Sequence, residues 1–319
     1  MTPSVSILVP CYNASPWLAA AISSALGQNW PAVEVIVVDD GSTDDSLSIA
    51  RSFAGRGVRV LQQPNRGAAA ARNLALTAAT GDFIQYLDAD DLLAPDKIAA
   101  QLYQPGVPDE TLTGRWGRFT NDPAQAEFDD DNPLFFSLTP RDYLLRYCGL
   151  GCMMHPAAWL VPHAVAKRAG SWNEALSLND DGEYFARVVL ASSGIRYCRE
   201  AISYYRVSGS GRLSAARSRR HLESAFHALE LIEQTFMATG DDPASRAAVA
   251  ELCQRFAYDY FPAAPDLVKR AETRARQLGG AKSRPLGGRG FLLMSQLLGW
   301  KLARRLQVAF GKFPRPPRD

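Results

Sequence analysis

The chain has 319 residues, of which 47% are hydrophobic and 21% are charged, and its formal net charge is +2. This composition can bury a sizeable core and excludes a disordered or fibrous protein, and its 5 cysteines form no disulfide framework. Residues 1–9 lack the basic region of a signal peptide and no run of about 20 apolar residues occurs, so we expect a cytoplasmic protein without a membrane-spanning helix.

Residues 1–104 alternate short apolar runs with helical segments. Alternation at this spacing predicts an α/β fold with a mostly parallel sheet flanked by helices. Ligands of such sheets bind beyond the carboxyl ends of the strands, so the segments 10–13, 39–42 and 88–91 should converge. The predicted strands cover residues 5–9, 33–38, 58–61 and 83–87, and the predicted helices cover 15–27, 46–54 and 67–79, with another beginning at Pro95.

The later part of the chain gives fewer sheet signals. Residues 105–150 are rich in Pro, Gly and Asp, which predicts irregular structure. Residues 157–189 predict helix, loop and helix, and 195–207 predict one or two strands. From residue 213 the pattern is helical, with a break at 240–243 and a linker at 281–290.

The last predicted helix, residues 291–313, has an apolar face and a basic flank. Residues 267–319 hold 13 Lys and Arg and two acidic residues, whereas residues 1–266 hold 22 Lys and Arg and 31 acidic residues. A basic end on an acidic body favours an anionic partner, and without a nucleic-acid-binding motif we expect a membrane surface and no nucleic acid. The alternative is a helix packed on the preceding domain. The apolar face is Leu298, Leu302, Leu306, Ala309 and Phe313, flanked by Lys301, Arg305 and Lys312.

Two aspartates separated by one residue, Asp88 and Asp90, follow the fourth predicted strand. Such a pair can hold a hard divalent cation, Mg²⁺ or Mn²⁺, that also binds substrate phosphates. The alternative is a solvated turn before the next helix. Asp40 ends the second strand, where a carboxylate can accept hydrogen bonds from a base or a ribose. Ser42 and Asp44, in contrast, are explained by capping of the following helix.

Two further positions each have a functional and a structural interpretation. Arg72, near the start of an Ala-rich helix, can reach a phosphate or pair with a nearby acid. Asp180 and Asp181 begin a later predicted helix, where an acid can act as general base for a hydroxyl. Acids in a first helical turn are also favoured by the helix dipole alone.

Five segments of the chain occur in the same order as the motifs of a known protein family. They are VSILVPCYN at 5–13, VVDDGSTD at 37–44, NRGAAAARN at 65–73, YLDADDLLAP at 86–95 and GSWNEALSLNDDGEYFAR at 170–187. Together they resemble the motifs of the family 2 inverting glycosyltransferases, which have the GT-A fold and use nucleotide-sugar donors. The resemblance spans residues 4–207.

The resemblance implies a role for each matching residue. For the donor, Pro10 and Tyr12 would line the base pocket and Asp40 would bind the base. Arg72 would lie near the pyrophosphate, and Asp88 would contact the nucleotide-sugar. Asp90 together with Asp88 would hold the Mn²⁺ or Mg²⁺ ion. For the acceptor, Asp181 would be the catalytic base, with Trp172, Glu174 and Asp180 close by.

The implied activity is an inverting, non-processive transfer of a hexosyl or N-acetylhexosaminyl group, with a UDP-sugar as the expected donor. The acceptor would be a hydroxyl of a glycan or lipid-linked molecule in polysaccharide or glycan assembly. Residues 1–212 would form the catalytic domain, with a donor half at 1–104 and an acceptor half at 105–212. Residues 213–319 would form a helical region whose basic tail can attach the protein to the inner face of the membrane.

The chain departs from the family pattern after its last predicted strand. The family often has a His there, and Arg206 or Arg212 could replace it. The Gln-x-x-Arg-Trp motif of processive members is absent from the sequence. Two alternatives remain open: a nucleotide-sugar-binding protein with degraded catalysis, and a haloacid-dehalogenase-like phosphatase, although Leu92 stands where that family has Thr or Val. Cys148, Cys152 and His155 lack the spacing of a common zinc site, and core packing is expected there.

Overall fold

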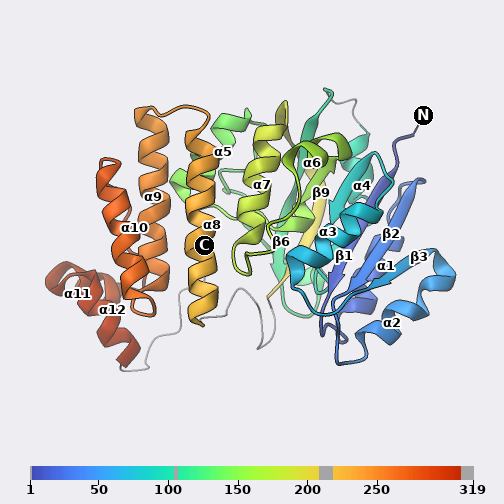
Figure 1. The fold of residues 1–319 in the computed structure, drawn as a ribbon, viewed down its shortest axis with the longest axis horizontal. Helices are drawn as coiled ribbons and strands as arrows, with labels where there is room; N and C mark the ends of the chain where they lie inside the picture. The colour runs from blue at the N-terminus through green and yellow to red at the C-terminus, as the bar shows by residue number, and fades with distance from the viewer. Residues whose placement is uncertain (1, 104–106, 208–217, 310–319) are drawn as a thin grey trace.

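The computed structural model describes residues 2–103, 107–207 and 218–309, which form a mixed sheet with helices on both faces and a row of further helices on one side (Figure 1). In the central strand, β1, Ile7 and Val9 pack into one core cluster and Leu8 packs into the other. Because alternate side chains of a strand point to opposite faces, a strand that is apolar throughout needs helices on both sides.

The predicted parallel strands are confirmed. Their order is β3-β2-β1-β4, and each pair is parallel. The strands are β1 Val5–Cys11, β2 Val33–Asp39, β3 Val58–Gln62 and β4 Phe83–Tyr86. The helices around them are α1 Leu18–Leu26, α2 Ser46–Ser52, α3 Ala68–Ala78 and α4 Lys97–Leu102, with a 3-10 turn at Ala54–Arg56.

The other half of the sheet is mixed. β8 runs antiparallel to β4 and to β6, β9 is parallel to β6, and β5 is antiparallel to β9. The short β7 pairs with β6. These strands are β5 Leu92–Leu93, β6 Glu110–Phe119, β7 Glu127–Phe128, β8 Trp159–Pro162 and β9 Gly194–Arg206.

Irregular structure was the wrong prediction for much of residues 105–150, because β6 and α5 form there. β6 has no simple alternation of apolar and polar residues, and its partner β9 lies about eighty residues later in the chain. β8 was likewise missed, whereas α6 and α7 confirm the predicted helices. The helices are α5 Pro140–Leu150, α6 His163–Ala169 and α7 Asp180–Ala191, with 3-10 turns at Pro123–Gln125 and Pro156–Ala158.

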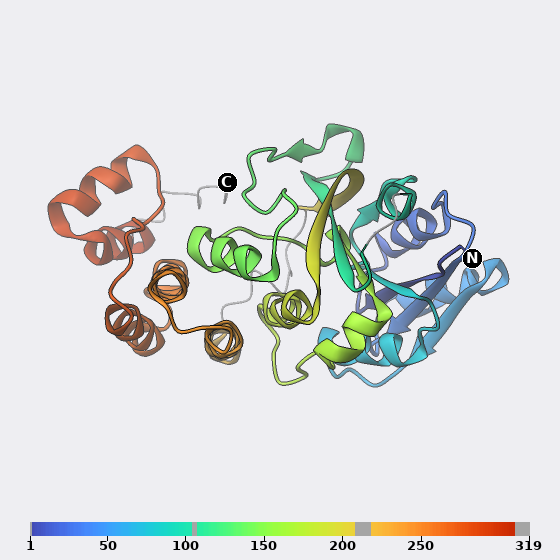
Figure 2. The ribbon, with the colours of Figure 1, turned by 90° about the horizontal axis from the view of Figure 1, so that it is seen from above.

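Three long helices follow, α8 Arg219–Met237, α9 Pro243–Tyr260 and α10 Pro265–Gln277. Figure 2 shows them nearly end-on, in a layer beside α5 and α7. Their buried Phe226, Phe236 and Phe256 belong to the same core cluster as residues of the sheet and of α7. The predicted break at 240–243 is confirmed, and Asp242 caps α9 there. The expected domain boundary at residue 212 lies outside the described residues.

One continuous final helix was the wrong prediction. The chain forms α11 Arg289–Leu298 and α12 Trp300–Ala309, separated by Gly299 at φ 78°, a left-handed conformation that ends a helix. Lys312 and Phe313, assigned to this helix from the sequence, lie outside the described residues. Across the described ranges, none of the helices is both long and apolar enough to span a membrane.

Candidate active site

The three segments expected to converge lie side by side beyond the carboxyl ends of β1, β2 and β4. Hydrogen bonds join the first two segments: Asp40 N donates to Cys11 O at 2.8 Å, and Thr43 N donates to Asn13 Oδ1 at 2.8 Å. Asn13 has a φ of 47°, which Asn tolerates better than most residues. Because β4 flanks β1 on its other side, the loop of residues 88–91 borders the same area.

Asp40 is buried beneath the loop that connects β3 to α3. Its Oδ1 accepts hydrogen bonds from Gln63 Nε2 at 2.7 Å and from Arg66 N at 2.9 Å, and its Oδ2 accepts one from Gly67 N at 2.8 Å. These bonds fix the path of the loop into the N-terminus of α3. In this structure Asp40 thus organises the loop, and its contact with a nucleotide base stays a prediction.

Arg72 of α3 connects the two halves of the site. Its Nη2 lies 2.8 Å from Asp88 Oδ1, and its Nη1 lies 2.8 Å from Asp180 Oδ2. The guanidinium also stacks on Trp172, 4.4 Å from the ring centroid. Burial alone would lower the pKa of Arg72, but the two carboxylates raise its pKa above the ordinary value, so the side chain stays charged. Pairing with nearby acids, the structural alternative from the sequence, is therefore what this structure contains.

Asp181 stands in the first turn of α7, next to this ion-pair cluster. Burial raises the pKa of its carboxyl from 3.8 to about 6, the charge of Asp180 adds to that shift, and Arg72 opposes it. Tyr147 of α5 packs beside the same turn, because a Cβ placed on Gly182 would overlap the Tyr147 hydroxyl. A carboxyl whose pKa is close to neutral is suited to accept a proton from a hydroxyl.

A buried network holds the loop of residues 88–91 in place. Asp91 Oδ2 lies 3.0 Å from His155 Nδ1, and Asp91 Oδ1 accepts a hydrogen bond from Arg206 N at 2.8 Å. Arg206 Nε donates to Asp90 O at 2.7 Å. Burial lowers the pKa of His155 to about 3, so its ring is neutral. Asp91 and Arg206 thus fix the backbone that carries Asp88 and Asp90.

Arg206 lies on the last strand, close to where the sequence suggested a cation in place of the family's His, whereas Arg212 lies outside the described residues. The link between His155 and Asp91 was not predicted from the sequence. The two residues are 64 positions apart, and no local pattern connects them. The Tyr147 contact with the α7 turn was missed for the same reason.

The two residues expected at the base pocket differ in exposure. Tyr12 is half exposed just after β1, whereas Pro10 is buried inside the strand, paired with Val38 of β2. Tyr12 is therefore placed where a planar ring of a ligand could stack on it. Pro10 instead shapes the end of the strand that leads to it.

Of the three residues expected on the acceptor side, only Glu174 is exposed. Its carboxylate accepts hydrogen bonds from Arg66 Nη2 at 2.7 Å and from Asn73 Nδ2 at 2.9 Å. Trp172 is 1% exposed and stacks on Tyr184 with ring centroids 4.1 Å apart. Trp172 therefore lies in the core behind Arg72, and its place on the acceptor side stays a prediction.

Asp88 and Asp90 are chemically suited to a divalent cation. Carboxylate oxygens are the ligands that Mg²⁺ and Mn²⁺ prefer, and the Asp88 side chain is 27% exposed, so it reaches the open side of the loop. In the part of the chain that the structure describes, no group of three or more His, Cys, Asp or Glu could hold a metal. An ion that takes most of its ligands from phosphates and water needs only one or two ligands from the protein.

Comparison with known proteins agrees with this geometry. The model of the family described as glycosyl transferase family 2 matches residues 6–126. An uncharacterized glycosyltransferase of Haemophilus influenzae is 44% identical over 103 residues, which cover 31% of this chain and 41% of that protein. The glycosyltransferase GlyG of Streptococcus pneumoniae is 29% identical over 223 residues, which cover 65% of this chain and 71% of that protein.

Among solved structures, S. aureus TarS in complex with UDP-GlcNAc superposes with a TM-score of 0.70 at 19% identity, covering 98% of this chain and 93% of that one. A mannosyltransferase from Pyrobaculum calidifontis in complex with GDP-Man and Mn²⁺ superposes with a TM-score of 0.58 at 19% identity, covering 98% of this chain and 89% of that one. At such identities the likeness shows a shared fold of the GT-A type.

The match to the Haemophilus influenzae relative spans 41% of its length, and the match to E. coli YibD, an uncharacterized glycosyltransferase, spans 28%. The match to the family model nevertheless contains every donor-side residue singled out in the sequence, from Pro10 to Asp90. The match to the family model leaves no support for the alternative of a haloacid-dehalogenase-like phosphatase. Residues 6–126 therefore form a glycosyltransferase family 2 domain, and the chain has the GT-A fold.

Proposed function

We propose that this protein transfers a sugar from a nucleotide-sugar donor to a hydroxyl of an acceptor, with inversion at the anomeric carbon. The observation that carries the proposal is the cluster at the strand ends, where Arg72 joins Asp88 to Asp180 beside a carboxyl, Asp181, whose pKa is raised to about 6. The cluster keeps the pKa of one carboxyl close to neutral, next to a loop that could bind phosphate. Such an arrangement suits removal of a proton from a hydroxyl as a diphosphate leaves.

In this proposal each residue acts on a different part of the reactants. Asp181 accepts the proton of the acceptor hydroxyl as that oxygen attacks the anomeric carbon. Arg72 opposes the rise in the pKa of both Asp180 and Asp181 that burial causes, because its positive charge favours both carboxylates. Tyr12 and the loop fixed by Asp40 would hold the nucleotide. Asp88 and Asp90 would hold the divalent cation, which supplies positive charge for the leaving diphosphate.

A UDP-sugar is the proposed donor, supported by a similar fold that was solved with UDP-GlcNAc, although another similar fold was solved with GDP-Man. The proposed acceptor is a glycan or a lipid-linked molecule. Among relatives, a chondroitin synthase of Pasteurella multocida is 40% identical over 98 residues, which cover 30% of this chain and 10% of that protein. The proposed product therefore belongs to polysaccharide or cell-surface glycan assembly.

A ligand panel tests the donor and the cation together. UDP-, GDP-, dTDP- and CDP-sugars are added to the protein with Mn²⁺ or with chelator, and thermal unfolding is measured. One nucleotide class should stabilise the protein by about 2.7 kcal/mol at a hundredfold excess over its dissociation constant. The shift should disappear with chelator and in Asp90→Ala. Asp131→Ala, which removes an exposed aspartate elsewhere, is the matched control and should keep it. No shift with any donor would contradict the proposal.

The pH dependence of transfer provides a separate test. Since Asp181 acts when ionised and its pKa is about 6, kcat/KM should fall about tenfold for each unit of pH below 6 and level off above it. The measurement is a series of initial rates between pH 5 and 8 with saturating Mn²⁺. A profile that stays flat down to pH 5 would exclude Asp181 as the group that accepts the proton.

A further inference from the structure

The helix pair α11–α12 leaves most of its leucine side chains exposed. Leu293 is 59% exposed and Leu297 is 74% exposed, and they lie one helical turn apart on one side of α11. Single exposed leucines are common on protein surfaces, but several within one short segment indicate an interaction surface. The exposed leucines of this surface, called here the leucine surface, are Leu292, Leu293, Leu297, Leu298 and Leu302.

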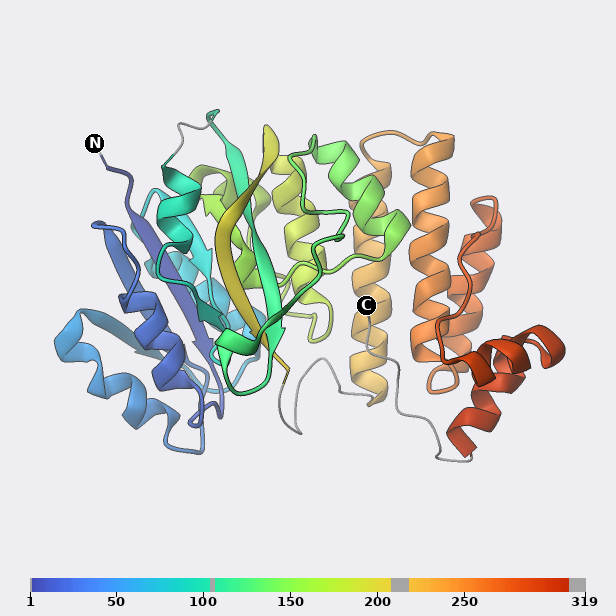
Figure 3. The same ribbon diagram turned by 180° about the vertical axis from the view of Figure 1, so that it is seen from behind.

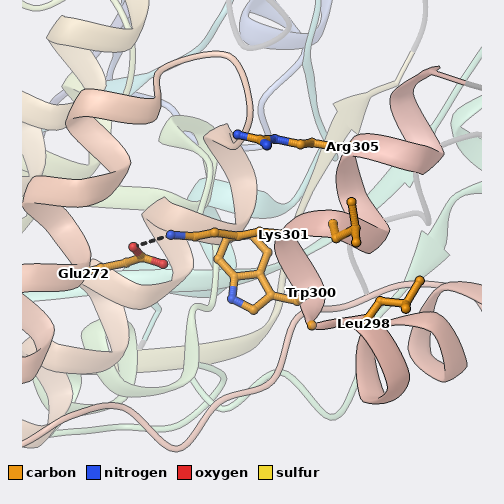
Figure 4. Close-up of a pocket in the computed structure, with 7 residues that line it drawn as sticks. Glu272, Leu298, Trp300, Lys301 and Arg305 are labelled. Carbon is orange, nitrogen blue, oxygen red and sulfur yellow. Dashed lines mark hydrogen bonds and ion pairs between the residues drawn. The ribbon is translucent and has the colours of Figure 1, made fainter.

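Other side chains attach the pair to the rest of the protein. Trp300 packs edge-on against Tyr258 and Phe261 of the neighbouring helical layer, and within the pair Arg304 lies over the buried ring of Phe291. Figure 4 shows Lys301 turned toward Glu272 of α10, with its Nζ 2.6 Å from the Glu272 carboxylate, at a pocket whose rim includes Leu298 and Arg305. Attachment therefore does not use the leucine surface, which stays available to a partner.

The leucine surface lies in a strongly basic segment. Residues 281–309 contain six Lys and Arg and no Asp or Glu, and Arg289 and Arg305 are exposed. Residues 1–266, in contrast, hold 22 basic and 31 acidic residues. A negatively charged surface would therefore attract this end of the molecule and repel the body, which fixes the orientation of approach.

We propose that α11–α12 docks on an anionic lipid surface, with the leucines among the upper acyl chains and Arg289 and Arg305 at the level of the lipid phosphates. Exposed leucines in a segment that itself holds no acidic residue, with flanking arginines, suit a helix that lies in the interface plane. A protein interface would be richer in Tyr and Trp at its centre, and a second copy of this chain would bring two basic surfaces together.

The position of the pair suits such docking. Figure 3 shows α11–α12 near the lower edge of the molecule, which is also the edge toward which β1 runs and where the candidate active site lies. A membrane along this edge would face the same side of the protein as the site. The inference does not depend on the proposed chemistry, because binding to lipid requires no donor.

Vesicle sedimentation with the full chain tests the inference. Vesicles of phosphatidylcholine with phosphatidylglycerol are compared with phosphatidylcholine alone, without nucleotide-sugar. The double variant Leu293→Asn with Leu297→Asn should lower the partition coefficient on anionic vesicles by about tenfold or more. Leu150→Asn, which changes a leucine that is 58% exposed at the end of α5, is the matched control and should bind as the unaltered chain does.

Charge is tested in the same assay. Arg289→Glu should weaken binding by at least about fivefold, whereas Arg56→Glu, which changes an exposed arginine on the opposite part of the molecule by the same charge, should not. Thermal unfolding of each variant should match that of the unaltered chain, since the changed side chains are exposed.

Three outcomes would overturn the inference. The first is no binding to anionic vesicles at low salt. The second is equal binding by the unaltered chain and the double leucine variant, which would leave only a non-inserting electrostatic contact. The third is self-association, seen by light scattering and abolished by the leucine changes, which would assign the surface to a second copy. Each leaves the donor panel unaffected, so failure here is distinguishable from failure of the proposed transferase.

Discussion

Replacing Asp181 by Asn should lower the rate of sugar transfer by about two to four orders of magnitude, the usual contribution of a positioned general base. Asn keeps the size and polarity of the side chain but cannot accept a proton from a hydroxyl. The donor-dependent thermal shift should persist, because the proposed donor contacts come from Asp88, Asp90 and the loop held by Asp40. Initial rates and thermal shifts on the same preparations give both quantities.

The same variant should be more stable than the unaltered chain at pH 8. The folded-state pKa of Asp181, about 6, lies above its ordinary value of 3.8, so the folded state binds this proton more tightly. The stability that this group contributes is present below pH 4 and is lost as the pH rises through 6. Asn does not titrate, so the variant should gain about 1–3 kcal/mol at pH 8.

Loss of activity with a gain in stability is the signature of a residue kept for chemistry. A variant that transfers sugar within about tenfold of the unaltered rate would contradict the assignment of Asp181 as the base. A fully inactive unaltered chain that still binds one donor would instead favour the alternative of a nucleotide-sugar-binding protein with degraded catalysis. Asp129→Asn, an exposed change away from the site, controls for the effect of removing one charge.

Replacing Arg72 by Met should destabilise the fold by about 3–5 kcal/mol, the usual effect of removing one partner from a buried ion pair. Met fills similar space, so the cost comes mainly from the charge left on Asp180, which is 7% exposed, and on Asp88. Urea unfolding at pH 8 measures the change. The cost should shrink at low pH, because the pKa of Asp180 is already raised by burial and would rise further without Arg72.

Arg66→Met is the matched control for this experiment. Arg66 also pairs across the site, with Glu174, but the two side chains are 61% and 39% exposed, so the pair contributes at most about 1 kcal/mol. The double variant Arg72→Met with Asp180→Asn should recover part of the lost stability, because it removes the uncompensated carboxylate. Equal destabilisation by Arg72→Met and Arg66→Met would contradict the buried ion-pair arrangement.

The sequence alone determined the parallel half of the fold and the positions from which the site is built. Apolar, β-branched runs such as Val33–Asp39 are buried on both faces, so the signal for the strand is contained in the strand itself. Parallel strands also place their carboxyl ends at one edge of the sheet, so the order of strands and loops along the chain already assigns Asp40, Asp88 and Asp90 to one region.

Tertiary structure decided the rest, because those features depend on partners far away in the chain. Arg72 pairs with Asp180 across 108 residues, Trp172 is buried by the ring of Tyr184, and β6 takes its strand form from β9. The break at Gly299 was hidden by a helical pattern that continues on both sides of it. Exposure of the leucines of α11 depends on the tertiary contacts of the helix pair, such as that of Trp300 with Phe261, which no local pattern specifies.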